Sequence, residues 1–202
     1  MPLEIARARR YIKEFNLTAL FVEELGWDRH TQTFPVPIDC QTFTFSAVAQ
    51  KRGMVAFTCT TPADAIPDYP TRRKIERQLT KCVHEHLIIY TDASRATQIW
   101  QWVKREAGKP TACREHYYHR SQPGDALIQK LQTLAFSLDE EELLTLPHVT
   151  GRVRAAFDVD RVTKRFYDRF KDEHGAFLKF LKGIPDEDMQ RWYVSVMLNR
   201  LM

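Results

Sequence analysis

The run "LIIY", Leu87 to Tyr90, constrains the fold more than any other short segment of this chain. Four consecutive apolar residues offer no polar face to water, so a strand built from them is buried on both faces. The segment directly before it, "TRRKIERQLTKCVHEH", places Ile75, Leu79 and Val83 at helical spacing. A buried strand that follows an amphipathic helix predicts an α/β protein.

Composition is that of a globular protein, with 44% hydrophobic and 28% charged residues among 202. Lys and Arg total 30 against 26 Asp and Glu, a net charge of +4 that permits a polyanionic partner if the cations cluster. No apolar run reaches the roughly 20 residues that span a bilayer, so we expect a cytoplasmic protein without a membrane partner. The cysteines form no C-x-x-C pair and the histidine spacing fits no zinc site, so we predict no metal centre from these residues.

Strand and helix signals follow one another along the first part of the chain. A helix in two parts, ending at Gly26, is followed by three antiparallel strands, with a hairpin loop at Asp39 and Cys40. Pro35 and Pro37 place the first of these strands at a sheet edge. After the helix and the "LIIY" strand come two more strands, in "TQIWQWVKRE" and "CREHYYHR", and a helix from about Gly124. We therefore predict a small mixed sheet flanked by helices.

Strand signals stop near residue 145, and the rest of the chain reads as helix. The sequence predicts an α/β domain over residues 1–145 and an all-α segment over residues 146–202. The final helix reaches the last residue with apolar positions still recurring, which is typical of a chain cut before further protein. We expect Phe177, Phe180, Trp192 and Met197 to form an exposed apolar patch that can drive homodimerisation.

The order of elements also suggests a nuclease of the PD-(D/E)xK type, in which carboxylates hold Mg²⁺ and a lysine steadies the attacking water. Yet the strand "MVAFTCT", which should supply the acid and the lysine, contains neither. The predicted domain is therefore a degenerate nuclease-like fold. The available catalytic candidates are Glu24, Asp39 and Asp68, with Lys51 or Lys74 as the lysine.

Cations gather in two clusters, each of which can neutralise phosphates or can simply be a solvated helical face. The first cluster contains Arg72, Arg73, Lys74, Arg77 and Lys81. The second contains Arg152, Arg154, Arg161, Lys164, Arg165 and Arg169. The density of Lys and Arg in both clusters, with Phe and Tyr residues interleaved in the second, predicts DNA-binding positions at both.

Several segments resemble the N-terminal region of bacterial single-chain restriction-modification methylases, which join a nuclease-like domain to an adenine-specific DNA methyltransferase. The segments are "LFVEELGWD", "AVAQKRGMVAF", "TRRKIERQLTKCVHEHLIIYTD", "QIWQWVKRE" and "FDVDRVTKRFYDRFKDEHGAFLKFLKGIPDED". They cover nearly the whole chain. The last is the most specific, because in such proteins a similar helix pair leads towards the methyltransferase domain.

The resemblance implies a piece of a larger enzyme whose partners are double-stranded DNA and the methyltransferase domain of the same parent chain. S-adenosylmethionine is then expected only in that missing domain, since these residues hold no glycine-rich cofactor loop. Three interpretations stay open: a DNA-contacting module without intact catalytic residues, an active Mg²⁺-dependent endonuclease, or a scaffold that orients the methyltransferase and touches no DNA.

Overall fold

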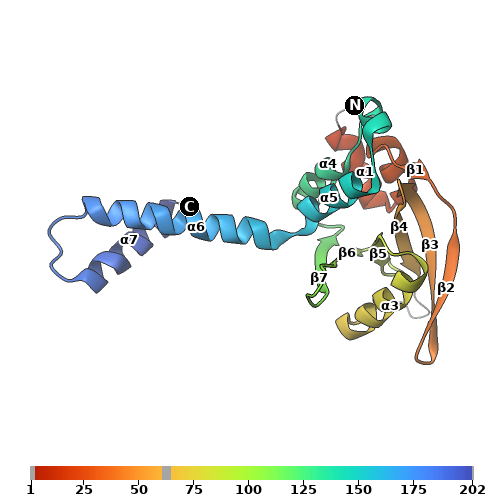
Figure 1. Ribbon diagram of the computed structural model, residues 1–202, viewed down its shortest axis with the longest axis horizontal. Helices are drawn as coiled ribbons and strands as arrows, with labels where there is room; N and C mark the ends of the chain where they lie inside the picture. Colours follow the sequence, from red (N-terminus) through yellow and green to blue (C-terminus); the bar gives the residue numbers. More distant parts are fainter. Residues whose placement is uncertain (1–2, 61–64, 202) are drawn as a thin grey trace. The chain divides into compact units, whose positions relative to one another are not determined.

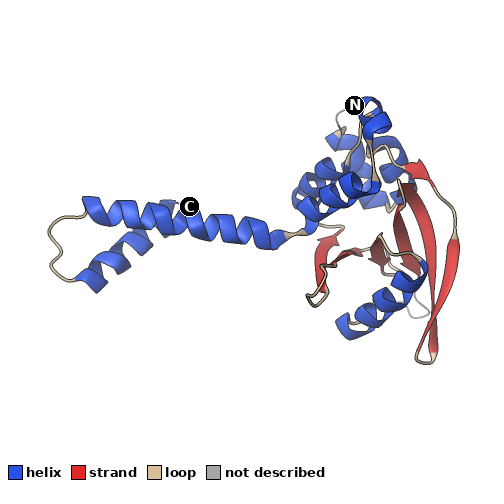
Figure 2. Ribbon diagram, viewed as in Figure 1, coloured by secondary structure: helices blue, strands red, loops and turns tan. Residues whose placement is uncertain are grey.

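A computed structural model describes residues 3–60 and 65–201, without the side chains of residues 60, 159–165 and 201. The chain divides into two compact units, Met1–Phe157 and Asp158–Met202. Every strand in the described residues belongs to the first unit, and the second is helical (Figure 2). No helix in this part of the chain is long and apolar enough to cross a membrane.

The first unit alternates helices and strands along the chain (Figure 1). Its helical elements are α1 (Ile5–Glu14), α2 (Leu17–Ala19), η1 (Leu20–Glu24), α3 (Tyr69–Cys82), α4 (Asp125–Leu134), the 3₁₀-helix η2 (Leu138–Leu143) and α5 (Leu146–Phe157). Its strands are β1 (Asp28–Arg29), β2 (Thr33–Ile38), β3 (Gln41–Lys51), β4 (Met54–Thr60), β5 (His86–Thr91), β6 (Thr97–Lys104) and β7 (Ala112–His119).

These strands form one mixed seven-stranded sheet in the order β1-β3-β4-β5-β6-β7, with β2 paired beside β1 on the same edge of β3. Only β4 and β5 run parallel; the other pairs are antiparallel. A parallel pair needs a crossover connection, and α3 supplies it between β4 and β5. The prolines in "TFPVPI" lie in β2, which pairs with β3 alone, so the predicted edge position is confirmed.

The "LIIY" segment lies at the centre of the sheet and faces two cores. Leu87 and Ile89 point into a cluster with α1, η1, α4 and α5, whereas Ile88 and Tyr90 point into a second cluster beneath α3. All four side chains are buried. The prediction of a strand buried on both faces is therefore confirmed, because consecutive strand residues alternate between two covered faces.

Helix α5 extends the first unit beyond the predicted boundary near residue 145. Its residues Val149, Val153 and Phe157 are buried in the same core as α4. The segment "LDEEELLTLPHVTG", which spans that predicted boundary, forms η2 and the start of α5. The two units divide between Phe157 and Asp158.

The second unit is a pair of helices, α6 (Val159–Phe180) and α7 (Glu187–Leu201). His174 of α6 donates from Nε2 to the carbonyl oxygen of Arg191 at 3.1 Å, and the same nitrogen lies 3.1 Å from Ser195 Oγ. Phe166 and Phe170 stack along α6 with ring centroids 6.2 Å apart. The α/β class and the helical C-terminal segment are therefore confirmed at this level.

Candidate functional site

Helix α3 turns one polar stripe towards the sheet. Arg72, Glu76 and Thr80 recur every four residues, so they share a helical face. Arg72 binds Glu115 of β7, and Arg105 binds both Glu76 and Thr80 Oγ1. Glu76 is the only acidic residue of α3, and it faces the sheet. The outer side of this helix therefore carries no carboxylate of its own.

The outer side of α3 carries Lys74, Arg77 and Lys81, which we call the α3 basic face. All three are exposed and recur at i, i+3 and i+7, on one side of the helix. Lys74 Nζ contacts Asp39 Oδ2 at 2.8 Å. In the described part of the chain, Arg77 and Lys81 have no carboxylate partner. Two cations are thus available to an external anion, and the third is held by a solvated ion pair that an anion can displace.

The other two cations of the first cluster are used within the protein. The Arg72 guanidinium is buried and forms two bonds to the Glu115 carboxylate, at 2.9 and 2.7 Å. Arg73 Nη2 donates to Thr111 Oγ1 at 3.0 Å. The predicted DNA-binding role of Arg72 is therefore not compatible with this structure, since a buried, paired guanidinium cannot reach a phosphate. Helical spacing gives a signal that the sequence prediction did not use, since Arg72 lies three residues before Ile75 and seven before Leu79, on the buried side of the helix.

Glu24 and Lys51, two of the predicted catalytic residues, line one cavity of about 500 Å³ between η1, the end of β3 and η2. We call it the acid–lysine cavity. Glu23, Asp28 and Glu141 also line it, and none of these three was predicted as a site residue. A sequence signal existed only for Glu141, in the acidic run "LDEEELL".

Glu24 and Lys51 of the acid–lysine cavity are each already paired within the protein. Glu24 accepts hydrogen bonds from the Arg7 guanidinium and from the Glu4 amide, the latter at 3.1 Å. Lys51, whose side chain is 2% exposed, lies 2.6 Å from Glu141 and 3.5 Å from Asp28. A reaction here requires Glu24 and Lys51 to exchange these partners for a substrate or an ion.

The remaining acids lie elsewhere. Asp39 occupies the β2–β3 turn with φ of 52°, at the end of β3 opposite Lys51. An 11-residue strand separates the two ends by on the order of 30 Å, so Asp39 and Lys74 cannot share a reaction centre with Glu24 and Lys51. Asp68 caps α3 by accepting from the Thr71 amide at 3.0 Å, and its hydrogen bonds with Thr71 lower the pKa of its carboxyl group.

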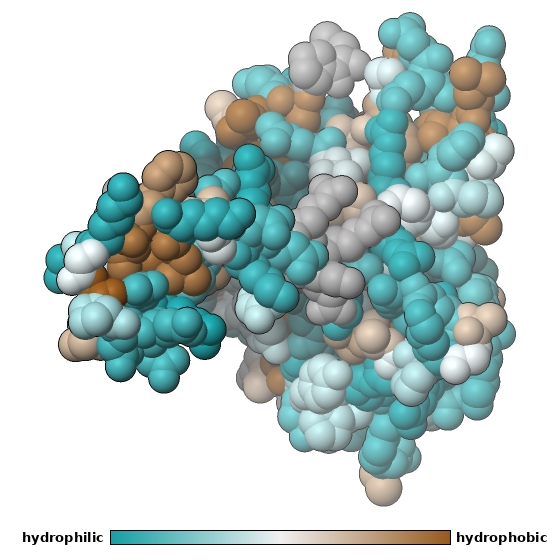
Figure 3. Space-filling view, turned by 60° about the vertical axis from the view of Figure 1, so that its left-hand side comes forward, coloured by the Kyte–Doolittle hydropathy of each residue, from teal (hydrophilic) through white to brown (hydrophobic). Residues whose placement is uncertain are grey.

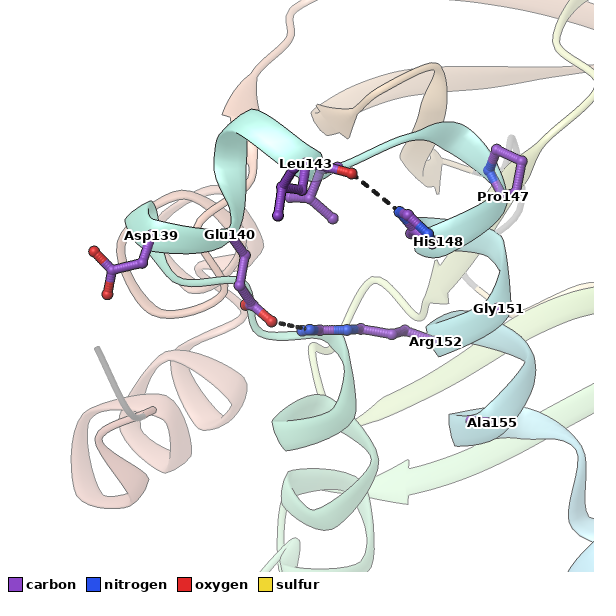
Figure 4. A pocket seen from close by; sticks show the side chains of 9 residues that line it. Asp139, Glu140, Leu143, Pro147, His148, Gly151, Arg152 and Ala155 are labelled. Atoms are coloured by element: carbon purple, nitrogen blue, oxygen red, sulfur yellow. Dashed lines mark hydrogen bonds and ion pairs between the residues drawn. The ribbon is translucent and has the colours of Figure 1, made fainter.

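Two arginines of the second predicted cluster form ion pairs within the first unit. Arg152 of α5 binds Glu140 of η2 across a pocket of about 550 Å³, where His148 Nδ1 also donates to the Leu143 carbonyl at 3.2 Å (Figure 4). Arg154 contacts Glu106. In the second unit, Arg169 is exposed, whereas the side chains of Arg161, Lys164 and Arg165 lie outside the described residues.

No group of three or more His, Cys, Asp or Glu residues in the described part of the chain is arranged to hold a metal ion. Comparison of the chain with protein-family models, curated proteins and solved structures finds no match. The interpretation of the α3 basic face and of the acid–lysine cavity therefore rests on their geometry and residue chemistry.

Proposed function

We propose that this chain contacts double-stranded DNA through the α3 basic face. The observation that carries the proposal is the segregation of charge on α3: Glu76 is turned inward and bound by Arg105, while Lys74, Arg77 and Lys81 face solvent. A helix with cations on its outer side and no acid of its own on that side attracts phosphates, and the Asp39 carboxylate at Lys74 is a competitor that a phosphate displaces.

The dimensions of the α3 basic face suit a phosphate backbone. Seven residues separate Lys74 from Lys81, which corresponds to about 10 Å along a helix. Phosphates of one DNA strand follow each other at a few ångströms of axial rise, so the face spans two or three of them. The Lys74–Asp39 pair is more than half exposed on both sides, and such a surface pair contributes little, so exchange of Asp39 for a phosphate costs little.

In this proposal the chain is a DNA-contacting, nuclease-like module of a restriction-modification methylase, without intact catalytic residues. The link to that class rests on the sequence resemblance of the five segments given above. It makes the methyltransferase domain of the parent chain the second partner, with S-adenosylmethionine bound there. It also places the protein in the cytoplasm, where bacterial DNA lies.

The proposal is tested by fluorescence anisotropy of a labelled random-sequence duplex, titrated with the purified chain in the absence of metal. Binding that weakens steeply as salt increases indicates phosphate contacts. No binding at low salt removes the DNA-contact proposal and favours a scaffold that orients the methyltransferase.

A second candidate function, a Mg²⁺-dependent endonuclease, is favoured by one observation: Glu24 and Lys51 line the same cavity. Incubation of supercoiled plasmid with the chain and Mg²⁺ tests it. Cleavage that Glu24→Gln and Lys51→Met each abolish, with the circular dichroism spectrum unchanged, supports an enzyme. Cleavage that survives in both variants, or no cleavage by the wild type, contradicts it.

A further inference from the structure

The second unit leaves large apolar side chains uncovered. Trp192 is 65% exposed, Met189 61% and Phe180 82%, whereas Val194 is fully buried. The sequence prediction of exposure is confirmed for Phe180 and Trp192, while Phe177 and Met197 are half-buried. Figure 3 shows apolar side chains gathered on this hairpin, which comes forward at the left of the view.

The uncovered positions follow a helical stripe on α7. The exposed Met189, Trp192 and Tyr193 lie at i, i+3 and i+4, and the half-buried Val196 follows at i+7, which is the spacing of a face that packs against another helix. Two helices cannot cover both of their apolar sides with each other, and stable helical bundles commonly contain four. The hairpin therefore supplies two of the four helices that such a bundle contains.

The exposed apolar surface of α6 and α7 taken together is about as large as the surface that one partner contributes to a dimer. Large apolar residues exposed in this unit are Phe166, Tyr167, Phe180, Met189, Trp192 and Tyr193. With about 150–250 Å² for each complete aromatic side chain, they expose on the order of 700 Å² together. This is close to the roughly 800 Å² that each partner contributes to an interface of standard size.

The charges at the two ends of α7 indicate in which direction a second helix packs against it. Acidic Glu187 and Asp188 lie at its first turn and basic Arg200 at its last. Arg191 lies 3.6 Å from Glu187 and 3.7 Å from Asp188 within the same helix, in widely exposed pairs that leave the carboxylates open to a second cation. An antiparallel copy of α7 brings Arg200 of one chain to the acidic turn of the other, at both ends of the contact.

We propose that the α6–α7 hairpin docks on the hairpin of a second copy of this chain, with the two α7 helices antiparallel. The two-fold axis passes near Trp192 and Tyr193, so the same patch serves both protomers. Opposed helix dipoles favour this arrangement over a parallel one. The proposal is independent of DNA binding, which concerns the first unit.

Sedimentation equilibrium of the full chain over a range of concentrations tests the proposal. The wild type is expected to be a dimer at micromolar concentration, and Trp192→Glu is expected to raise the dissociation constant at least about tenfold. Leu138→Glu is the matched control, because Leu138 is an exposed apolar residue of the first unit; its dissociation constant should equal that of the wild type. A monomeric wild type, or a Trp192→Glu variant that dimerises like the wild type, overturns the proposal.

A charge exchange tests the antiparallel orientation. Arg200→Glu places a carboxylate against the acidic turn of the partner and should weaken the dimer. Replacement of Glu187 and Asp188 by Lys in the same variant restores opposite charges across the interface and should bring the dissociation constant back towards the wild-type value. A dimer that Arg200→Glu leaves unchanged contradicts the antiparallel contact.

Discussion

Arg72 and Glu115 form a buried, two-bonded ion pair that joins α3 to β7, with side chains 5% and 8% exposed. Gln101 and Tyr117 donate to the same carboxylate at 2.9 and 2.8 Å. Burial alone would raise the pKa of Glu115, but these three donors outweigh it and lower that pKa below its usual range. The pair therefore holds the inner side of α3 while its outer side stays available.

We predict that Arg72→Met destabilises the protein by about 3 kcal/mol, because it leaves a buried carboxylate without its cation. The double variant Arg72→Met with Glu115→Leu should recover much of this loss, since neither charge remains buried. Urea unfolding followed by circular dichroism measures both. Equal stability of Arg72→Met and wild type would contradict the assignment of Arg72 to the fold.

The depressed pKa of Glu115 also predicts acid sensitivity. A carboxyl group whose pKa is lower in the folded state stabilises the fold above its unfolded pKa of about 4.3, and this contribution is lost as pH falls through the folded pKa. Below about pH 4, therefore, the Glu115→Gln variant should lose less stability per pH unit than the wild type. Parallel stability–pH curves for the two proteins would exclude this contribution.

His86 predicts a second pH effect in a higher window. Burial, together with the nearby Arg105 charge, lowers the pKa of His86 to about 4, and its Nδ1 donates to the Val83 carbonyl at 2.8 Å. Between about pH 6.5 and pH 4 the unfolded chain therefore binds a proton at this histidine and the folded chain does not. The free energy of unfolding should fall as the pH is lowered through this window, by at most about 1.4 kcal/mol per pH unit. His86→Asn should flatten the curve in this window; an unchanged curve would contradict the assignment.

The ion pair between Lys51 and Glu141 predicts unequal losses of stability when either partner is replaced. Lys51→Met leaves Glu141, which is 35% exposed, in contact with water, and should cost less than about 1 kcal/mol. Glu141→Gln leaves the buried Lys51 ammonium with only the Asp28 carboxylate at 3.5 Å, and should cost about 2 kcal/mol. Thermal unfolding of both variants measures the difference. The opposite order would show that Lys51 stabilises the fold through contacts other than this ion pair.

Gly26, beside the same cavity, has a backbone conformation and a close contact that only glycine fits. Its φ is +67°, and an added Cβ would lie 2.5 Å from the Phe136 carbonyl oxygen, a backbone atom with little freedom to move. Gly26→Ala should therefore destabilise the protein by more than about 2 kcal/mol. Gly151→Ala is the control, because Gly151 lies within α5 with open space around it; that variant should gain about 0.5–1 kcal/mol. Similar effects at the two positions would contradict the clash.

Periodicity in the sequence predicted the elements that carry a simple apolar pattern and failed to predict how charged side chains pair. "LIIY" and "TFPVPI" indicated a central and an edge strand because burial on two faces and loss of an amide donor are local properties. Helical spacing places Arg72 on the same side of α3 as Ile75 and Leu79 and places Arg77 on another side, so the side of each arginine could be predicted. The carboxylate that pairs with the buried Arg72 belongs to Glu115, 43 residues later, and no local pattern indicates that partner.

The acid–lysine cavity shows the same limit. Glu24 and Lys51 could be chosen as candidates from their residue types, but Glu141 belongs to an acidic run close to the predicted boundary near residue 145. Its approach to Lys51 depends on η2 folding back over the end of β3, a contact between residues 90 positions apart. No spacing rule predicts such a contact.

The measurement that tests the central claim most directly is the salt dependence of duplex binding by the wild type and by Arg77→Gln with Lys81→Gln. Three phosphate contacts give a slope of log K against log[salt] of about −2.7, and loss of two reduces it to about −0.9. The charge-matched control, Arg10→Gln with Lys13→Gln on α1, should keep the wild-type slope. Equal slopes for the wild type and the α3 variant would contradict DNA contact through the α3 basic face.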